Sequence, residues 1–179
     1  MDASNAFVLA RLENIRSRIQ SAQDPVYAAL QFAVLGNYLD FAALQAINPD
    51  VIGWLYIPDT KINYPILQGD NNDQYIYHLM TGEYNSAGSL FLESGIAPDF
   101  SEQNSAVYGH NMKNNTMFAN ILKYRDQEFY DAHPIGMLMT PEKNYQFEII
   151  TAYVAEPNES AWQLAFLSDE EALNWALAS

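Results

Sequence analysis

The sequence has 179 residues, of which 49% are hydrophobic and 13% aromatic. A chain of this length and composition folds around a core rather than remaining disordered. Its net charge of -14 excludes a nucleic-acid surface built on clustered Lys and Arg, and is typical of a soluble acidic protein. It contains no cysteine, which excludes disulfides, thiolate metal sites and thiol catalysis within these residues. We expect no cofactor.

Residues 1–47 are predicted to form an N-terminal helical segment. Apolar residues recur at helical spacing from Phe7 to Ile19, and Asp24-Pro25 is a helix start signal. Asn48-Pro49-Asp50 is expected to end the helical region, because a residue that precedes proline disfavours the α conformation.

Short β-type runs separated by turn residues follow from residue 51 onward. They predict strands at 51–57, 62–67, 88–93, 105–109, 136–140 and 145–154. Many short strands indicate a mainly β fold, a closed or nearly closed barrel. Two short helices are expected between the strands. One spans 72–79, and the other starts near Thr116, whose side chain would cap it.

The last predicted element is a helix that opens at a capping box, with Ser168 three residues before Glu171. The sequence stops at Ser179, inside this amphipathic pattern and without a terminating glycine or proline. We therefore expect further residues to follow in the complete protein.

The three histidines differ in their sequence context. His110 ends a predicted strand and precedes a polar loop, which favours a working residue, although packing is the alternative. His78 is expected to be a half-buried packing residue in a short helix, and His133 lies in a turn before Pro134. Their spacing does not match a metal site.

Four motifs in sequence order resemble those of class B sortases, which are cell-surface cysteine transpeptidases of Gram-positive bacteria. They are "NPDVIGWLYIPDTKINYPILQGDNNDQY" (48–75), "SAGSLFLE" (86–93), "VYGHNMKNNTMF" (107–118) and "FYDAHPIGMLMTPEKNYQFEIITAYV" (129–154). The resemblance runs from Asn48 to the end of the chain. It implies that residues 48–179 form a sortase-type β-barrel that is incomplete at its C terminus.

The same resemblance assigns site residues. It implies that His110 is the catalytic histidine, while the family's cysteine strand and arginine strand would lie beyond Ser179. We therefore expect this truncated chain to be inactive. Asn72 and Ile76 match positions that line the peptide groove; a helix cap and core packing are the alternatives for these two residues. Trp162 falls where a mobile segment that covers the groove begins, and it could instead simply pack.

The family chemistry implied is cleavage of a sorting signal after threonine and transfer to an amine on a cell-wall precursor or a surface protein. The implied location is the extracellular face of the membrane, with an N-terminal anchor that is absent here, and no nucleic-acid partner. A non-catalytic peptide-binding or scaffolding module that retains the groove is the alternative. Missing strands would leave unpaired edges, which predicts either marginal stability or self-association through those edges.

Overall fold

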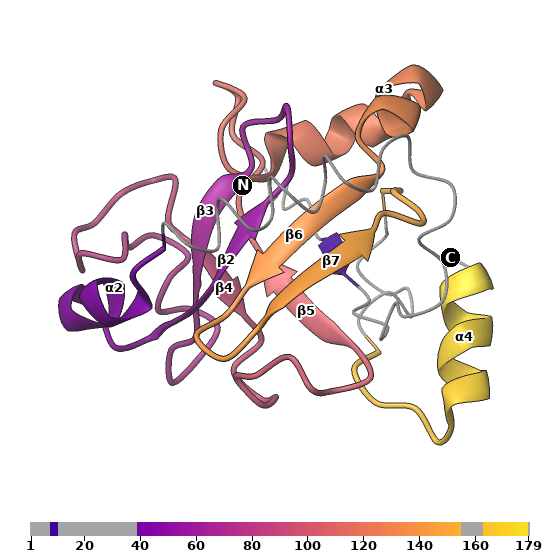
Figure 1. Cartoon of the computed structure of the whole chain (residues 1–179). Helices are drawn as coiled ribbons and strands as arrows, with labels where there is room; N and C mark the ends of the chain where they lie inside the picture. The colour runs from indigo at the N-terminus through magenta and orange to yellow at the C-terminus, as the bar shows by residue number, and fades with distance from the viewer. Residues whose placement is uncertain (1–7, 11–38, 155–162, 179) are drawn as a thin grey trace.

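The computed structural model describes residues 8–10, 39–154 and 163–178. Its strands form one curled, open sheet with the order β1-β5-β4-β3-β2-β6-β7 (Figure 1). The strands are β1 (Val8–Ala10), β2 (Val51–Tyr56), β3 (Asn63–Leu67), β4 (Leu90–Leu92), β5 (Ser105–Tyr108), β6 (Ile135–Met139) and β7 (Asn144–Glu148). The mainly β, incompletely closed fold expected from the sequence is confirmed.

The predicted strands from residue 51 onward form close to their expected positions. β2 pairs antiparallel with both β3 and β6, whereas β3 and β4 run parallel. Buried and partly exposed residues alternate along β2, as the two-residue period of a strand requires. The last strand is shorter than predicted, because regular pairing with β6 ends at Glu148.

Two apolar clusters of described residues stabilise the sheet. The larger joins buried residues of β2, β3, β4, β5, β6 and β7 to Phe118, whose side chain is fully buried. The smaller contains Val51, Leu67, Tyr75 and Phe91, with Phe41 and Leu44 of the first described helix packed against it. That helix therefore closes one end of the sheet through its apolar side.

Within the described residues, three α-helices and one 3-10 helix accompany the strands. They are α2 (Phe41–Ile47), η1 (Phe118–Arg125), α3 (Gln127–Ala132) and α4 (Asp169–Ala178). Figure 1 shows α2 and α4 on opposite sides of the sheet. No helix within the described ranges is both long enough and apolar enough to cross a membrane.

The predicted ends of two helices are confirmed. α2 stops at Asn48, which has extended backbone angles, one residue before Pro49. At the start of α4, the Glu171 amide donates to the Ser168 hydroxyl at 3.2 Å, as a capping box requires. The Glu171 carboxylate accepts from the Leu167 amide at 2.7 Å and so completes the cap one residue earlier than expected.

The helical prediction for residues 1–47 is wrong at Val8–Ala10, which pair with β5 in antiparallel register. A strand edge with free backbone groups favours any apolar segment that can extend along it. Most of the other residues of this prediction, including the Asp24-Pro25 start signal, lie outside the described ranges.

The helix expected at Thr116 forms as η1, but Thr116 does not cap it through its side chain. The Thr116 hydroxyl instead donates to the Asn114 side chain at 2.6 Å. Met117 occupies the cap position with φ of 52° and has no side-chain capping bond. The local Asn–Thr hydrogen bond therefore forms in place of the capping bond that the sequence suggested.

Candidate active site

His110 lies just beyond the end of β5, where Gly109 passes very close to two core side chains. A Cβ built on Gly109 would lie 2.3 Å from Leu90 Cδ2 and 2.8 Å from Phe118 Cδ2. A larger residue would therefore push the strand end away from the core. Glycine at this position lets the chain pass close to Phe118 as it enters the polar loop, and this sets the position of His110.

The loop after His110 is tied back to its own start. The Phe118 amide donates to the His110 carbonyl at 2.9 Å, and Asn111 and Met117 form an isolated antiparallel bridge. The Met117 amide also donates to the Tyr64 hydroxyl at 3.1 Å. The polar run that follows His110 in the sequence is thus a closed loop, and it holds the backbone of His110 in place.

The His110 imidazole is partly exposed and contacts the segment that precedes β4. Its Nε2 lies 2.8 Å from the backbone carbonyl oxygen of Ile76. Its ring stacks on Tyr77, with the ring centroids 5.4 Å apart and the planes 29° apart. Among the described residues, Nδ1 has no hydrogen-bond partner, so the ring keeps one nitrogen available for proton transfer.

The segment 72–79 forms successive turns rather than the predicted helix. The Asn71 side chain accepts from the amides of Asp73 and Gln74 at 2.9 and 3.0 Å. Such an Asx turn offers the backbone an alternative to helical hydrogen bonds. Ile76 lies in this segment, is partly buried and packs against the smaller apolar cluster, while its carbonyl reaches His110.

Asn72 does not cap a helix. Its side-chain amide donates to Glu93 Oε1 at 2.7 Å, and its side-chain oxygen accepts from the Ser94 amide at 2.8 Å. Both ends of the side chain therefore link the turn segment to the residues that follow β4. The structure brings Ile76 to His110, whereas the Asn72 side chain binds Glu93 and Ser94 rather than the imidazole.

Glu93 is a partly buried carboxylate that sequence reasoning missed. Tyr108 donates its hydroxyl to Glu93 Oε2 at 2.6 Å, and the Gly95 amide lies 3.3 Å from Oε1. Burial alone would raise the pKa of Glu93, but the hydrogen bonds from Tyr108, Asn72, Gly95 and Ser94 together lower that pKa below its usual range. Burial and the Glu93 hydrogen bond raise the pKa of Tyr108. Glu93 therefore stays ionised beside the segment that carries Asn72.

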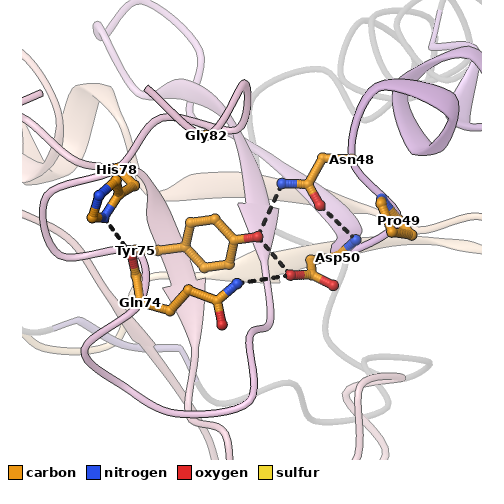
Figure 2. A pocket seen from close by; sticks show the side chains of 7 residues that line it. All are labelled: Asn48, Pro49, Asp50, Gln74, Tyr75, His78 and Gly82. Carbon is orange, nitrogen blue, oxygen red and sulfur yellow. Dashed lines mark hydrogen bonds between the residues drawn. The ribbon is translucent and has the colours of Figure 1, made fainter. Parts of the chain in front are cut away.

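A pocket of about 360 Å³ lies on the α2 side of the same turn segment. Its lining residues, labelled in Figure 2, are Asn48, Pro49, Asp50, Gln74, Tyr75, His78 and Gly82. The Tyr75 hydroxyl donates to Asp50 Oδ2 at 2.6 Å and accepts from the Asn48 side chain at 2.9 Å. Burial, followed by the bond to Asp50, raises the pKa of Tyr75 to about 12. These bonds fasten the start of β2 to the turn segment, and His110 does not line the pocket.

This network is only partly visible in the sequence. Asn48-Pro49-Asp50 ends α2 as expected, but its side chains also bond to Tyr75 and Gln74, which lie more than 20 positions away. Partners this distant along the chain are set by the fold and cannot be read from local spacing.

The other candidate residues do not join His110. His133 is a structural residue, because it ends α3, stacks on Phe129 at 4.1 Å and places Nδ1 2.8 Å from the Phe129 carbonyl. His78 is exposed rather than half-buried, and its Nδ1 lies 2.9 Å from the Gln74 carbonyl. Trp162 lies outside the described residues. Among the side chains that the structure describes, no group of three His, Asp or Glu residues is placed to hold a metal ion.

Comparison with known proteins gives a consistent picture. The family model of the sortase domain matches residues 55–174. Sortase B of Listeria monocytogenes is 44% identical over 110 residues, which is 62% of this chain and 45% of that protein. Sortase B of Staphylococcus aureus is 30% identical over 131 residues, which is 73% of this chain and 54% of that protein. The chain thus spans about half the length of the curated relatives it matches.

The fold comparison agrees with the sequence comparison. The structure of a Staphylococcus aureus sortase B–substrate complex superposes with a TM-score of 0.75 at 26% identity, covering 85% of this chain and 73% of that one. The curled sheet and its connecting helices are therefore shared with a structure that holds a substrate.

Proposed function

Because this chain belongs to the sortase family, we propose that it supplies the histidine side of a class B sortase-type active site. The observation that carries the proposal is the placement of His110. A glycine-dependent strand end presents the imidazole, and its Nε2 lies against the carbonyl of Ile76 while Nδ1 has no partner among the described residues. An imidazole held in this way can accept a proton and return it.

The proposed reaction is transpeptidation through a cysteine. A thiolate attacks the carbonyl of a threonine in a sorting signal and forms a thioacyl intermediate. His110 protonates the departing amine and then deprotonates the incoming amine, and an arginine stabilises the oxyanion. These 179 residues contain no cysteine, so the thiol has to come from outside them. We propose the same for the arginine. The chain alone is therefore expected to be inactive.

Substrate contacts are proposed for three residues. Asn72 and Ile76 lie on the segment that contacts His110, which supports a peptide path along this segment. Trp162 is proposed to cover the groove. We further propose that the peptide is a sorting signal and that the acceptor is an amine on a cell-wall precursor or a surface protein. The enzyme would work at the cell surface, anchored by an N-terminal segment outside this sequence.

A fused chain tests this proposal most directly. The 179 residues are joined to the C-terminal part of Listeria monocytogenes sortase B, which by the family pattern supplies the cysteine and the arginine. We expect cleavage of a fluorogenic sorting-signal peptide. His110→Ala should lower kcat/KM by about 100-fold or more, because a general acid–base contributes at least that much. The matched control is His133→Ala, a histidine that contacts Phe129 of α3 and lies outside the turn segment, and it should leave the rate of the folded fusion unchanged. A folded, active fusion that tolerates His110→Ala would overturn the proposal.

The unfused chain separates catalysis from binding. We expect no peptide turnover above that of its own His110→Ala variant. The amide resonances of residues 71–78 and 109–111 should shift when sorting-signal peptide is added, but not when a scrambled peptide is added. Turnover by the unfused chain would contradict the proposed need for a thiol. Tight binding by the unfused chain, together with an inactive folded fusion, would favour the non-catalytic peptide-binding module.

A further inference from the structure

Two neighbouring residues of the turn segment hold the His110 ring from different directions. The Ile76 carbonyl oxygen lies 2.8 Å from Nε2, in hydrogen-bonding contact with the ring edge. The Tyr77 ring covers one face of the imidazole at 5.4 Å. We call these two groups, the Ile76 carbonyl and the Tyr77 ring, the His110 clamp.

The carbonyl determines which ring nitrogen carries the proton. A carbonyl oxygen can only accept a hydrogen bond, so Nε2 must be protonated to bond with Ile76. In the neutral ring the lone pair then lies on Nδ1. Rotating the imidazole by half a turn would exchange Nε2 for a ring carbon and break the bond, so the clamp favours one orientation.

The carbonyl is itself held in place. On one side of Ile76, the Tyr75 carbonyl accepts from the Ser89 amide at 3.0 Å; on the other, the Tyr77 carbonyl accepts from the Asn85 amide at 2.8 Å. Gly88 permits this approach, because a Cβ there would lie 2.2 Å from the Ile76 carbonyl oxygen. The acceptor that faces His110 is thus fixed before any peptide arrives.

Tyr77 is not a core residue. Its side chain is 48% exposed, and its only other described ring contact is Tyr84 at 6.1 Å, which is itself 74% exposed. A large aromatic side chain in this position gains little from burial. Its best-defined contact is the imidazole face, where stacking restricts rotation of the ring.

We propose that Tyr77 is a positioning residue that, with the Ile76 carbonyl, holds His110 as the Nε2–H tautomer and leaves Nδ1 as the nitrogen that exchanges protons. Nδ1 gains one proton when the ring becomes cationic and gives the same proton back, while Nε2 keeps its proton throughout. The catalytic meaning of this clamp rests on the proposed function. The ring geometry does not, so the two can fail separately.

Nitrogen NMR of the 15N-labelled 179-residue chain tests the geometry at mildly alkaline pH. We expect a single His110 tautomer, with a protonated Nε2, an unprotonated Nδ1, and an Nε2-bound proton protected from solvent exchange. Tyr77→Leu should accelerate exchange of that proton roughly 10-fold or more, since the ring loses its cover. Tyr77→Phe keeps the aromatic face and should retain the protection. Tyr84→Leu, which removes an exposed tyrosine that does not stack on His110, should also retain it.

Two results would overturn the proposal: a mixture of His110 tautomers in the unaltered chain, or unchanged protection in Tyr77→Leu. The backbone amide spectrum reports whether each variant is folded. If Tyr77→Leu unfolds the chain, Tyr77→Met, whose flexible side chain adapts to irregular surroundings, decides the question by the same readout.

The fused chain adds a functional readout. Tyr77→Leu should lower kcat roughly 10-fold with KM unchanged, because misplacing a proton-transfer group affects the chemical step rather than binding. Tyr77→Phe should restore the rate. A fully inactive fusion would count against the proposed function and leave the NMR result standing, whereas an active fusion indifferent to Tyr77→Leu would remove Tyr77 from catalysis.

Discussion

The two ends of β5 treat their buried polar groups differently. At its C-terminal end, Tyr108 bonds to Glu93, and just beyond that end His110 bonds to the Ile76 carbonyl. At its N-terminal end, Asn104 and Ser105 are each only 2% exposed. Asn104 donates to the Gln163 carbonyl at 2.7 Å, but Asn104 Oδ1 and Ser105 Oγ have no hydrogen-bond partner among the described residues.

The region around Asp50, Glu93 and His110 pairs its polar groups within the described structure, and we call it the self-sufficient region. The region at the start of β5 instead carries an energetic cost. A buried polar atom without a partner typically costs about 1–3 kcal/mol relative to a paired one. Around Asp50, Glu93 and His110, paired side chains hold the turn segment firmly against the sheet. At the start of β5, the described structure leaves polar atoms buried and unpaired.

The largest expected effect comes from breaking the network in Figure 2. Asp50→Ala removes the acceptor of the Tyr75 hydroxyl. Tyr75 is only 3% exposed, so its hydroxyl would lose a partner inside the fold. We expect the free energy of unfolding to fall by about 2 kcal/mol in urea titrations. Asp70→Ala is the control, since it removes an exposed carboxylate whose residue contacts Gln74 only through its backbone amide.

The pairing itself can be isolated with a double-mutant cycle. Asp50→Ala and Tyr75→Phe should be non-additive by about 1 kcal/mol, because each removes the same hydrogen bond. Strictly additive losses would mean that the bond contributes nothing to the self-sufficient region.

A smaller effect on stability is expected from removing the charge of Glu93, and this effect depends on pH. Its pKa is lower in the folded chain than in the unfolded one, so its ionised form stabilises the fold. This contribution is present above the unfolded pKa of about 4.3 and is lost as pH falls through the lower folded pKa. Glu93→Gln should therefore be less stable than the unaltered chain at neutral pH, by less than about 1 kcal/mol because solvent screens a partly exposed group.

The pH dependence provides the check on Glu93. The stability difference between Glu93→Gln and the unaltered chain should be smaller in acidic than in neutral unfolding titrations, because protonation of the carboxylate removes its stabilisation as pH falls through the lowered folded pKa. Tyr108→Phe removes one of the hydrogen bonds to Glu93 and should reduce the same difference in part. A gap that stays constant between the two pH values would contradict the assigned stabilisation.

The smallest effect is expected at the other end of β5. Ser105→Ala removes a buried hydroxyl that has no described partner, so stability should stay within about 0.5 kcal/mol or increase. Ser89→Ala is the matched comparison, because the Ser89 hydroxyl is buried and donates to the His78 carbonyl at 2.9 Å. It should cost about 1 kcal/mol. Equal losses in thermal unfolding would erase the contrast between the two regions.

The strands were predictable because their signal is local. Val51–Tyr56 and Ile135–Met139 are apolar runs bounded by turn residues, and each forms a strand within a residue or so of its expected place. The helix predicted at 72–79 failed for an equally local reason, the Asn71 side chain, which competes with helical hydrogen bonds. The strand at Val8–Ala10 was missed because it depends on a partner, β5, far along the chain.

The candidate site was only partly predictable. His110 could be singled out from its place at a strand end, and the family resemblance named Asn72 and Ile76. The carbonyl that faces the imidazole, the stacking of Tyr77 and the carboxylate of Glu93 could not be found, because each is a contact across the fold. Backbone acceptors in particular leave no trace in residue type.

The parallel pairing of β3 with β4 has a consequence for how this site can change. Parallel neighbours cannot be joined by a tight hairpin, so the chain must return along the sheet before β4 begins. Residues 68–89 are that return path, and it delivers Ile76 and Tyr77 to the imidazole. Topology thus separates two parts: a strand end that carries His110, the proposed proton-transfer group, and an obligatory excursion whose sequence can vary without rebuilding the sheet.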